Sequence, residues 1–223
     1  MVFVEDGSLM IKILYEDNHV LVVVKPVNMP VCLDSSGDLD LLSYLKNYLK
    51  EKYNKPGNVY LGLIHRLDRP VGGVMVFAKT SKAASRLCDQ VRTGKVSKRY
   101  YAVVCGNLFE SGEFHDKLLK DSKTNMVCVD SSGKDSSLKY NVLWNKNNFS
   151  LVDIELITGR SHQIRVQFSS RNYPLFGDQR YNKSSKVGEQ IALFSYYLSF
   201  VHPTTHELME FKENIPNRYP FNI

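Results

Sequence analysis

The sequence lacks any apolar run long enough to cross a membrane. Its apolar stretches, such as Val20 to Val24, are far shorter than the ~20 residues that a membrane-spanning helix needs. No basic segment precedes an apolar stretch at the N-terminus, which argues against a signal peptide. The four cysteines are widely spaced and form no C-x-x-C pair, so they are interpreted as reduced thiols rather than as a disulfide framework or a zinc site. A cytoplasmic chain with no membrane partner and no bound metal is expected.

Internal repeats, low-complexity tracts and Pro/Gly-rich linkers are also absent from the sequence. With 223 residues and 43% hydrophobic content, the chain can bury a sizeable core. We therefore expect a single domain over residues 1–223, with its core at about 11–216. A monomer is favoured, because nothing in the sequence points to a second copy.

Positive charge is concentrated in one segment of the chain. The net charge is +6, and residues 79–99 hold seven basic residues against one acid, so this segment equals the whole excess. A concentrated positive field suits a phosphate-rich partner such as nucleic acid. A solvated helix face explains the same run equally well, so charge alone leaves both interpretations open.

Hydrophobic periodicity predicts many short strands and a few helices. The expected strands are Ile11–Tyr15, Val20–Lys25, Val59–Ile64, Val74–Ala78, Tyr100–Cys105, Leu138–Trp144, Phe149–Ile157, Ile191–Val201 and Glu207–Phe211. The expected helices are Leu41–Leu49 with Asp38 or Asp40 as its cap, Ala83–Val91 ended by Gly94, and about Ser161–Ser169. Consecutive hairpins with few helices favour an α+β fold on a largely antiparallel sheet.

One short segment stands out for its chemistry, LGLIHRLDRPVGG at residues 61–73. If the strand runs through Asp68, alternation places Ile64, Arg66 and Asp68 on one face. Arg66 and Arg69 flank Asp68, and nearby guanidinium groups favour an ionised carboxylate. Taken alone, the segment is better explained by a surface Arg–Asp–Arg cluster that holds a loop.

This segment, HRLDRPVGG followed by VMVFAKT, resembles the catalytic motif of the RluA family of RNA pseudouridine synthases. Further segments resemble motifs of that family in the same order: YEDNHVLVVVKPVNMPV with its Lys25-Pro26 pair, KRYYAVVCG, TGRSHQIRVQF with the following PLFGDQRY, and LSFVHPTTHELMEF. The resemblance implies a pseudouridine synthase-like α+β fold with flanking helices, a central catalytic cleft and no cofactor. A separate N-terminal S4 domain is not expected, since the first matched strand begins near Ile11.

The resemblance also implies a role for each matched residue. Asp68 stands at the position of the catalytic aspartate, and Arg165 at that of the arginine that pairs with it. Tyr100 stands at the tyrosine that packs on the target base and is proposed to take the proton from C5. Arg66 matches an arginine that helps to fill the space left by the flipped nucleotide. RNA contacts are expected from further basic residues of the motifs: Arg69, Lys98 and Arg160.

The implied reaction isomerises uridine in ribosomal or transfer RNA to pseudouridine. Product and substrate have the same atoms, so the reaction has no need of a redox cofactor. A carboxylate can serve by taking the C2′ proton, by attacking C1′ or by adding to C6, and the sequence leaves these routes open. The uridine has to leave its stack to reach a pocket, and this is least costly in loops and bulges.

Structural explanations and two other functions remain open at this point. Arg165 can cap or salt-bridge its own helix, Tyr100 can be ordinary core, and His162 and Gln163 are expected to brace their motif by hydrogen bonds. A catalytically silent RNA-binding module on the same scaffold would use the basic segment without needing Asp68. A carboxylate-dependent hydrolase of RNA is the other alternative. Val71-Gly72-Gly73 also departs from the Thr-Ser-Gly of many relatives, so hydroxyl contacts at those positions are in doubt.

Overall fold

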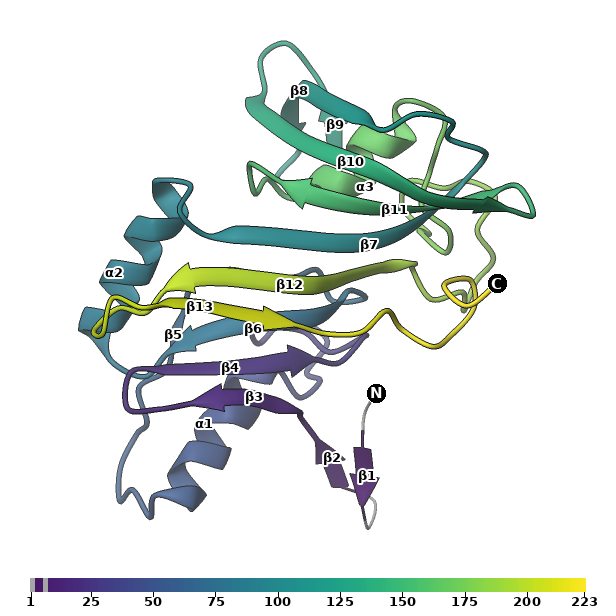
Figure 1. Ribbon diagram of the computed structural model, residues 1–223. Coiled ribbons are helices and arrows are strands. Elements are labelled where there is room, and N and C mark those ends of the chain that lie inside the picture. Colours follow the sequence, from purple (N-terminus) through teal and green to yellow (C-terminus); the bar gives the residue numbers. More distant parts are fainter. Residues whose placement is uncertain (1–2, 6–7) are drawn as a thin grey trace. The chain divides into compact units, whose positions relative to one another are not determined.

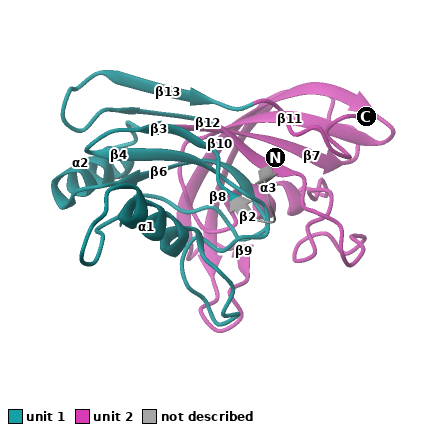
Figure 2. Ribbon diagram, turned by 90° about the horizontal axis from the view of Figure 1, so that it is seen from below, with its two compact units in different colours: residues 1–96, 197–213 teal, residues 97–196, 214–223 magenta. Residues whose placement is uncertain are grey.

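The computed structural model describes residues 3–5 and 8–223 of the chain (Figure 1). The chain forms two compact units, coloured teal and magenta in Figure 2. Unit 1 comprises Met1–Val96 and Tyr197–Glu213, and unit 2 comprises Ser97–Tyr196 and Asn214–Ile223. The expected single domain over residues 1–223 stays a prediction. No helix in the described ranges is both long and apolar enough to span a bilayer.

Unit 1 is built on short antiparallel strands and two helices. Its strands are β1 (Phe3–Glu5), β2 (Ser8–Met10), β3 (Ile13–Glu16), β4 (Val20–Lys25), β5 (Gly62–Leu63), β6 (Gly72–Ala78) and β13 (Leu208–Lys212). Strand β12 (Leu193–Val201) contributes residues to both units and pairs with β13. Strand β4 pairs with β3 on one side and with β6 on the other, so β4 is interior. All of its residues are buried, which requires cover on both faces of the sheet in addition to pairing at both edges.

The two helices of unit 1 begin where the sequence supplies a cap. Helix α1 (Leu41–Lys52) starts at Asp40, whose carboxylate accepts a hydrogen bond from the backbone N–H of Ser43 at 3.0 Å. Helix α2 (Ser81–Arg92) starts at Thr80, whose hydroxyl accepts from the N–H of Ala83 at 3.1 Å. Gly94, with φ +71°, lies just beyond α2 in the left-handed region that terminates helices.

The core between α2 and the sheet of unit 1 follows from alternation along the strands. One face of β4 and β6 contributes Val20, Val22, Val74, Val76 and Ala78. Helix α2 covers this face with Ala83 and Leu87, both almost fully buried. Each fully buried aliphatic side chain of this kind stabilises the fold by roughly 1.5–3 kcal/mol.

Unit 2 is an antiparallel sheet covered on one face by a short helix. The strand order is β7 (Ser97–Cys105), β11 (Phe149–Leu156), β10 (Lys134–Lys146), β8 (Gly112–Lys120) and β9 (Val127–Val129). Asn147 and Asn148, with φ of +51° and +61°, make the tight turn between β10 and β11. Helix α3 (Gln163–Ser169) packs through Phe168, whose ring lies 5.0 Å from that of Phe114.

The α+β class expected from the sequence is confirmed, with antiparallel pairing at every pair described above. Strands β8 and β9 were not expected from the sequence. In β8, only Phe114 and Leu118 are buried among charged and polar neighbours, so the segment has too few apolar residues to reveal its alternation.

Candidate active site

Asp68 lies on a turn between β5 and β6. The strand does not continue through Asp68, because β5 ends at Leu63 and residues 64–71 are irregular, so the alternation of Ile64, Arg66 and Asp68 on one strand face does not apply. The backbone oxygen of Asp68 accepts a hydrogen bond from the N–H of Val71 at 2.9 Å, which closes the turn around Pro70. Asp68 is partly exposed, whereas Leu67 and Val71 are buried on its two sides. The turn therefore fixes the backbone and leaves the carboxylate reachable.

The buried side chain of Lys25 anchors this turn through hydrogen bonds. Its ammonium is completely buried and donates to three backbone carbonyls, those of Pro26 at 2.9 Å, Arg69 at 3.0 Å and Val71 at 2.8 Å. These carbonyls lack strand partners, so the ammonium takes the place of a hydrogen-bonded neighbouring strand. Burial lowers the pKa of Lys25 to about 7, and the charge of Asp68 opposes this shift.

The two arginines beside Asp68 differ in their surroundings. Arg66 is exposed. The guanidinium of Arg69 contacts Asp38, donates to the hydroxyl of Ser36 at 2.9 Å, and lies 3.6 Å from the carboxylate of Asp34. Arg69 thus ties the turn to the loop that precedes α1. Its expected contact with RNA stays a prediction.

Tyr100 lies on β7 in unit 2 and is 5% exposed, facing Ile154 of β11 in the strand register. The neighbouring Tyr101 points to the other face and stacks on Tyr196, with ring centroids 3.8 Å apart. Tyr101 is therefore part of the packing of unit 2, while Tyr100 belongs to the opposite side of the strand.

Arg165 lies on α3 and is held by a buried carboxylate. Its Nε and Nη2 atoms donate to Asp178 at 2.8 and 2.7 Å, and the two side chains are 6% and 0% exposed. The guanidinium carbon also lies 5.2 Å from the centre of the Tyr181 ring. A bidentate pair of this kind fixes the plane of the guanidinium. Asp178 was not expected from the sequence as a partner of Arg165.

The residues before Arg165 brace its motif, as expected. Gln163 accepts hydrogen bonds from the Thr158 hydroxyl at 2.8 Å and from the N–H of Arg160 at 3.0 Å. His162 adopts φ +51° at the start of α3, and its Nδ1 lies 2.7 Å from the Tyr181 hydroxyl. The loop and the helix are therefore locked together by side chains.

The remaining expected RNA contacts lie close to this motif. Lys98 on β7 is mostly buried, and burial lowers its pKa. Its ammonium lies close to Gly159, where an added Cβ would sit 3.2 Å from Nζ. Arg160 is exposed and donates through Nε to the backbone oxygen of Asp135 at 3.0 Å.

The expected site residues are thus divided between the two units. Asp68, Arg66 and Arg69 belong to unit 1. Those in unit 2 are Tyr100, Arg165, Lys98 and Arg160. The pairing of Asp68 with Arg165, and a central cleft that joins them, stay predictions. The sequence named the Lys25-Pro26 pair and the segment containing Asp178 as motifs, but it assigned neither residue its structural partner.

The fold and these motifs define the class of protein. Residues 19–170 match the family described as RNA pseudouridylate synthase, and this stretch includes Asp68, Tyr100 and Arg165. The chain belongs to the RNA pseudouridylate synthase family. The class expected from the sequence is therefore confirmed: the chain is an RNA pseudouridine synthase of the RluA type, and the silent RNA-binding alternative is not favoured.

Individual relatives agree with this assignment. The ribosomal large subunit pseudouridine synthase D of Zymomonas mobilis subsp. mobilis is 32% identical over 227 residues, which cover 95% of this chain and 71% of that protein. The solved structure of human RNA pseudouridylate synthase domain containing 4 superposes with a TM-score of 0.77 at 22% identity, covering 92% of this chain and 89% of that one. Human RNA pseudouridylate synthase domain containing 1 gives 0.73 at 25% identity, with 95% and 86% covered. The pseudouridine synthase-like fold is confirmed.

The buried Lys25 ammonium is expected to make stability depend on pH. Its pKa is about 7 in the folded chain and 10.5 when unperturbed, so between these values the unfolded chain binds a proton that the folded chain does not. The free energy of unfolding should therefore rise with pH across this window by up to ~1.4 kcal/mol per unit from this group, and its contribution should be constant below about pH 7. Urea unfolding of the wild type and Lys25→Met from about pH 7 to 9 measures the difference. Exposed Lys50→Met is the control, and equal pH slopes for wild type and Lys25→Met would contradict the expectation.

Removing the charge of Asp178 is expected to destabilise the chain strongly. Asp178→Asn keeps the shape of the side chain but leaves the buried Arg165 guanidinium without this counter-charge. The free energy of unfolding should fall by roughly 3–5 kcal/mol, as for other broken buried pairs. Asp135→Asn, on an exposed carboxylate, should change it by less than about 0.5 kcal/mol. Denaturant titration measures both, and a loss for Asp178→Asn as small as that of the control would show that the pair is dispensable.

Proposed function

We propose that this chain isomerises uridine in large-subunit ribosomal RNA to pseudouridine, with Asp68 as its essential carboxylate. The observation that carries the proposal is the match of residues 19–170 to the synthase family, with Asp68 on a turn anchored by Lys25. The choice of ribosomal RNA is supported by relatives such as the large subunit synthase D of Zymomonas mobilis.

The reaction breaks the C1′–N1 bond of uridine, turns the detached base and joins C1′ to C5. The proton on C5 leaves and one returns to N1, so the atoms balance without a second substrate. In the proposal, the partly exposed Asp68 is the group that initiates this exchange at the sugar or the base. Its turn is rigid because Lys25 holds the carbonyls of Arg69 and Val71, so the carboxylate has little freedom to move away from a bound nucleotide.

Arg165 and Tyr100 complete the proposed site. Arg165 would pair with the Asp68 carboxylate and keep it ionised in a dry pocket, opposing the rise in pKa that burial alone would cause. Its guanidinium is pre-oriented, because Asp178 already binds Nε and Nη2. Tyr100 would stack its ring on the uracil and take the C5 proton through its hydroxyl.

The proposed role of Asp68 is tested by substitution. Asp68→Asn removes the negative charge with little change of shape, so the variant should fold and bind RNA. It should release tritium from C5-labelled uridine in RNA at least ~10³-fold more slowly than the wild type, since loss of a residue that acts on the reacting atoms has effects of this order. Glu51→Gln, on an exposed carboxylate of α1, is the control. Turnover by Asp68→Asn close to that of the wild type would remove Asp68 from this role.

Analysis of the RNA products distinguishes isomerisation from hydrolysis. Unchanged RNA mass with pseudouridine at the target supports the proposal, whereas free uracil or cut strands would assign a hydrolase.

The proposed substrate class is tested in cells. Pseudouridine mapping of total RNA with and without this protein should show one or a few uridines of the large-subunit ribosomal RNA that lose their modification. Re-expression of the wild type should restore them, and re-expression of Asp68→Asn should not. Lost sites confined to transfer RNA would overturn the choice of ribosomal RNA while leaving the chemistry intact.

A further inference from the structure

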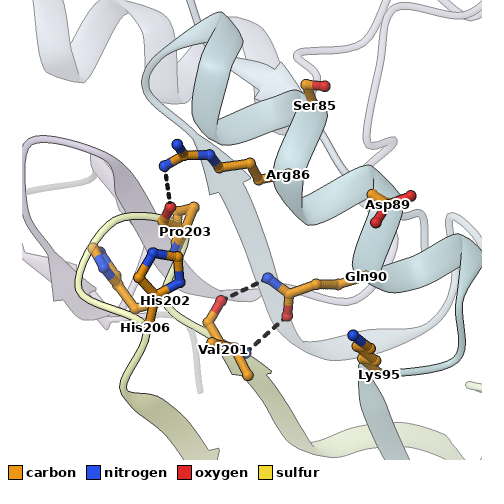
Figure 3. Close-up of a pocket in the computed structure, with 9 residues that line it drawn as sticks. All are labelled: Ser85, Arg86, Asp89, Gln90, Lys95, Val201, His202, Pro203 and His206. Carbon is orange, nitrogen blue, oxygen red and sulfur yellow. Dashed lines mark hydrogen bonds between the residues drawn. The ribbon is translucent and has the colours of Figure 1, made fainter.

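Unit 1 contains a pocket that the proposed catalytic residues do not use. It has a volume of about 520 Å³ and lies between α2 and the turn that joins β12 to β13 (Figure 3). Helix α2 contributes Arg86, Asp89 and Gln90 to its lining, and the turn contributes His202 and His206. Lys95, just beyond the end of α2, lines it as well.

Hydrogen bonds between the helix and the turn fix the walls of this pocket. The side chain of Gln90 binds the backbone of Val201 twice, donating to its oxygen at 2.7 Å and accepting from its N–H at 2.8 Å. Arg86 donates through Nη1 to the backbone oxygen of Pro203 at 2.5 Å. Figure 3 shows these contacts bridging the two elements. The pocket is therefore preformed, and a ligand would not have to order it.

His202 stabilises the turn from within. It is 1% exposed, and its Nδ1 accepts hydrogen bonds from the N–H groups of Thr204 at 3.3 Å and Thr205 at 3.0 Å. Its Nε2 therefore carries the proton that it donates to Asp17 at 2.9 Å. Both ring nitrogens of His202 are thus occupied by hydrogen bonds within the protein, so His202 lines the pocket without offering a nitrogen to a ligand. The exposed His206 has φ +64° and stands at the tip of the turn.

The charge of the pocket is positive because its one carboxylate is already paired. Asp89 binds the guanidinium of Arg92 at 2.5 Å, outside the lining. Arg86 and Lys95 thus supply the uncompensated charges, and both side chains are exposed. Their N–H groups are the donors that phosphate oxygens accept.

Apart from Arg86, which lines the pocket and donates to Pro203, most basic residues of segment 79–99 are paired or partly buried within the chain. Three of its cations form ion pairs within their own unit: Lys79 with Glu16, Arg92 with Asp89 and Arg99 with Asp153. Lys98 is mostly buried. For Lys82 and Lys95, no ion pair occurs within the described part of the chain. Of these two, Lys95 is the one that lines the pocket.

The pocket is separated from Asp68 by the length of a strand. Lys25, which anchors the Asp68 turn, ends β4, while Val20 begins it and donates its N–H to Asp17. Asp17 in turn holds His202. Five steps along an extended strand span about 17 Å. A ligand that touches both places must therefore be several nucleotides long.

We propose that this pocket binds a backbone phosphate of the substrate RNA, several nucleotides away from the target uridine. The inference rests on the proposed function, since it adds a second contact for the same RNA. Lys95 and the remaining N–H groups of Arg86 would neutralise the phosphate, and His206 would add a donor at the rim. A contact of this kind positions the RNA without reading its sequence.

The test measures how RNA binding depends on salt. A uridine-containing RNA stem–loop of about 30 nucleotides is titrated by fluorescence anisotropy with the wild type, Lys95→Ala and Lys212→Ala, at salt concentrations from about 50 to 200 mM. Loss of one phosphate contact should reduce the slope of log K against log salt by roughly 0.7–0.9 for Lys95→Ala. Lys212 is an exposed lysine at the end of β13 far from the turn, so Lys212→Ala should keep the wild-type slope. A wild-type slope for Lys95→Ala would overturn the proposal.

Two further arms identify the source of the phosphate. A uridine trinucleotide cannot span the distance from Asp68, so Lys95→Ala should bind it as the wild type does. ATP, titrated by calorimetry, should give no saturable binding that depends on Lys95. Saturable ATP binding that is lost in Lys95→Ala would overturn the assignment to RNA in favour of a free nucleotide.

The salt slope is read without turnover, so its outcome is independent of the isomerisation assay. A wild-type chain that releases tritium, with an unchanged slope for Lys95→Ala, overturns the pocket alone. A reduced slope for Lys95→Ala in a chain that releases no tritium overturns the isomerase chemistry alone.

Discussion

The buried ammonium of Lys25 is the interaction on which the candidate site of unit 1 depends. The chain has to present Asp68 from an irregular turn, and an irregular backbone inside a protein leaves carbonyls without partners. Lys25 binds three carbonyls at 2.8–3.0 Å, those of Arg69 and Val71 just after Asp68 and that of its neighbour Pro26. The ammonium is shielded from solvent in return, which depresses its pKa. The Lys25 side chain, at the end of an interior strand, thus donates the hydrogen bonds that a neighbouring strand would otherwise supply.

Unit 2 uses the same strategy with the opposite charge. Asp178 comes from an irregular segment and accepts hydrogen bonds from Arg165 on α3 and from the backbone N–H groups of Arg180 and Tyr181. One fully buried carboxylate therefore shapes the segment and orients the guanidinium. Each unit holds its candidate site residue by a buried charge bound to backbone or to a partner side chain, so the geometry within each unit is fixed in the folded chain.

The distribution of positive charge shows why composition is a weak guide to a binding surface. From sequence, residues 79–99 form a strongly basic stretch. In the fold, Lys79 forms an ion pair with Glu16, and Arg99 forms one with Asp153. Their charges are therefore neutralised within the protein. What remains available is a smaller set at the end of α2, beside a preformed pocket. The field that RNA meets is therefore set by which carboxylates the fold brings near each cation.

The sequence by itself determined the family, the α+β class, a capping aspartate before α1, the end of α2 at Gly94, and the bracing role of His162 and Gln163. These are local properties: a cap, a hairpin turn or a motif is encoded by neighbouring residues. The pairs Lys25 with the Asp68 turn, Arg165 with Asp178 and His202 with Asp17 were decided by the tertiary structure. Their members lie 13 to 185 residues apart along the chain, and no local pattern specifies such a contact. The irregular path through Asp68 was decided in the same way, because alternation shows which residues are apolar but not that a distant lysine will satisfy the backbone.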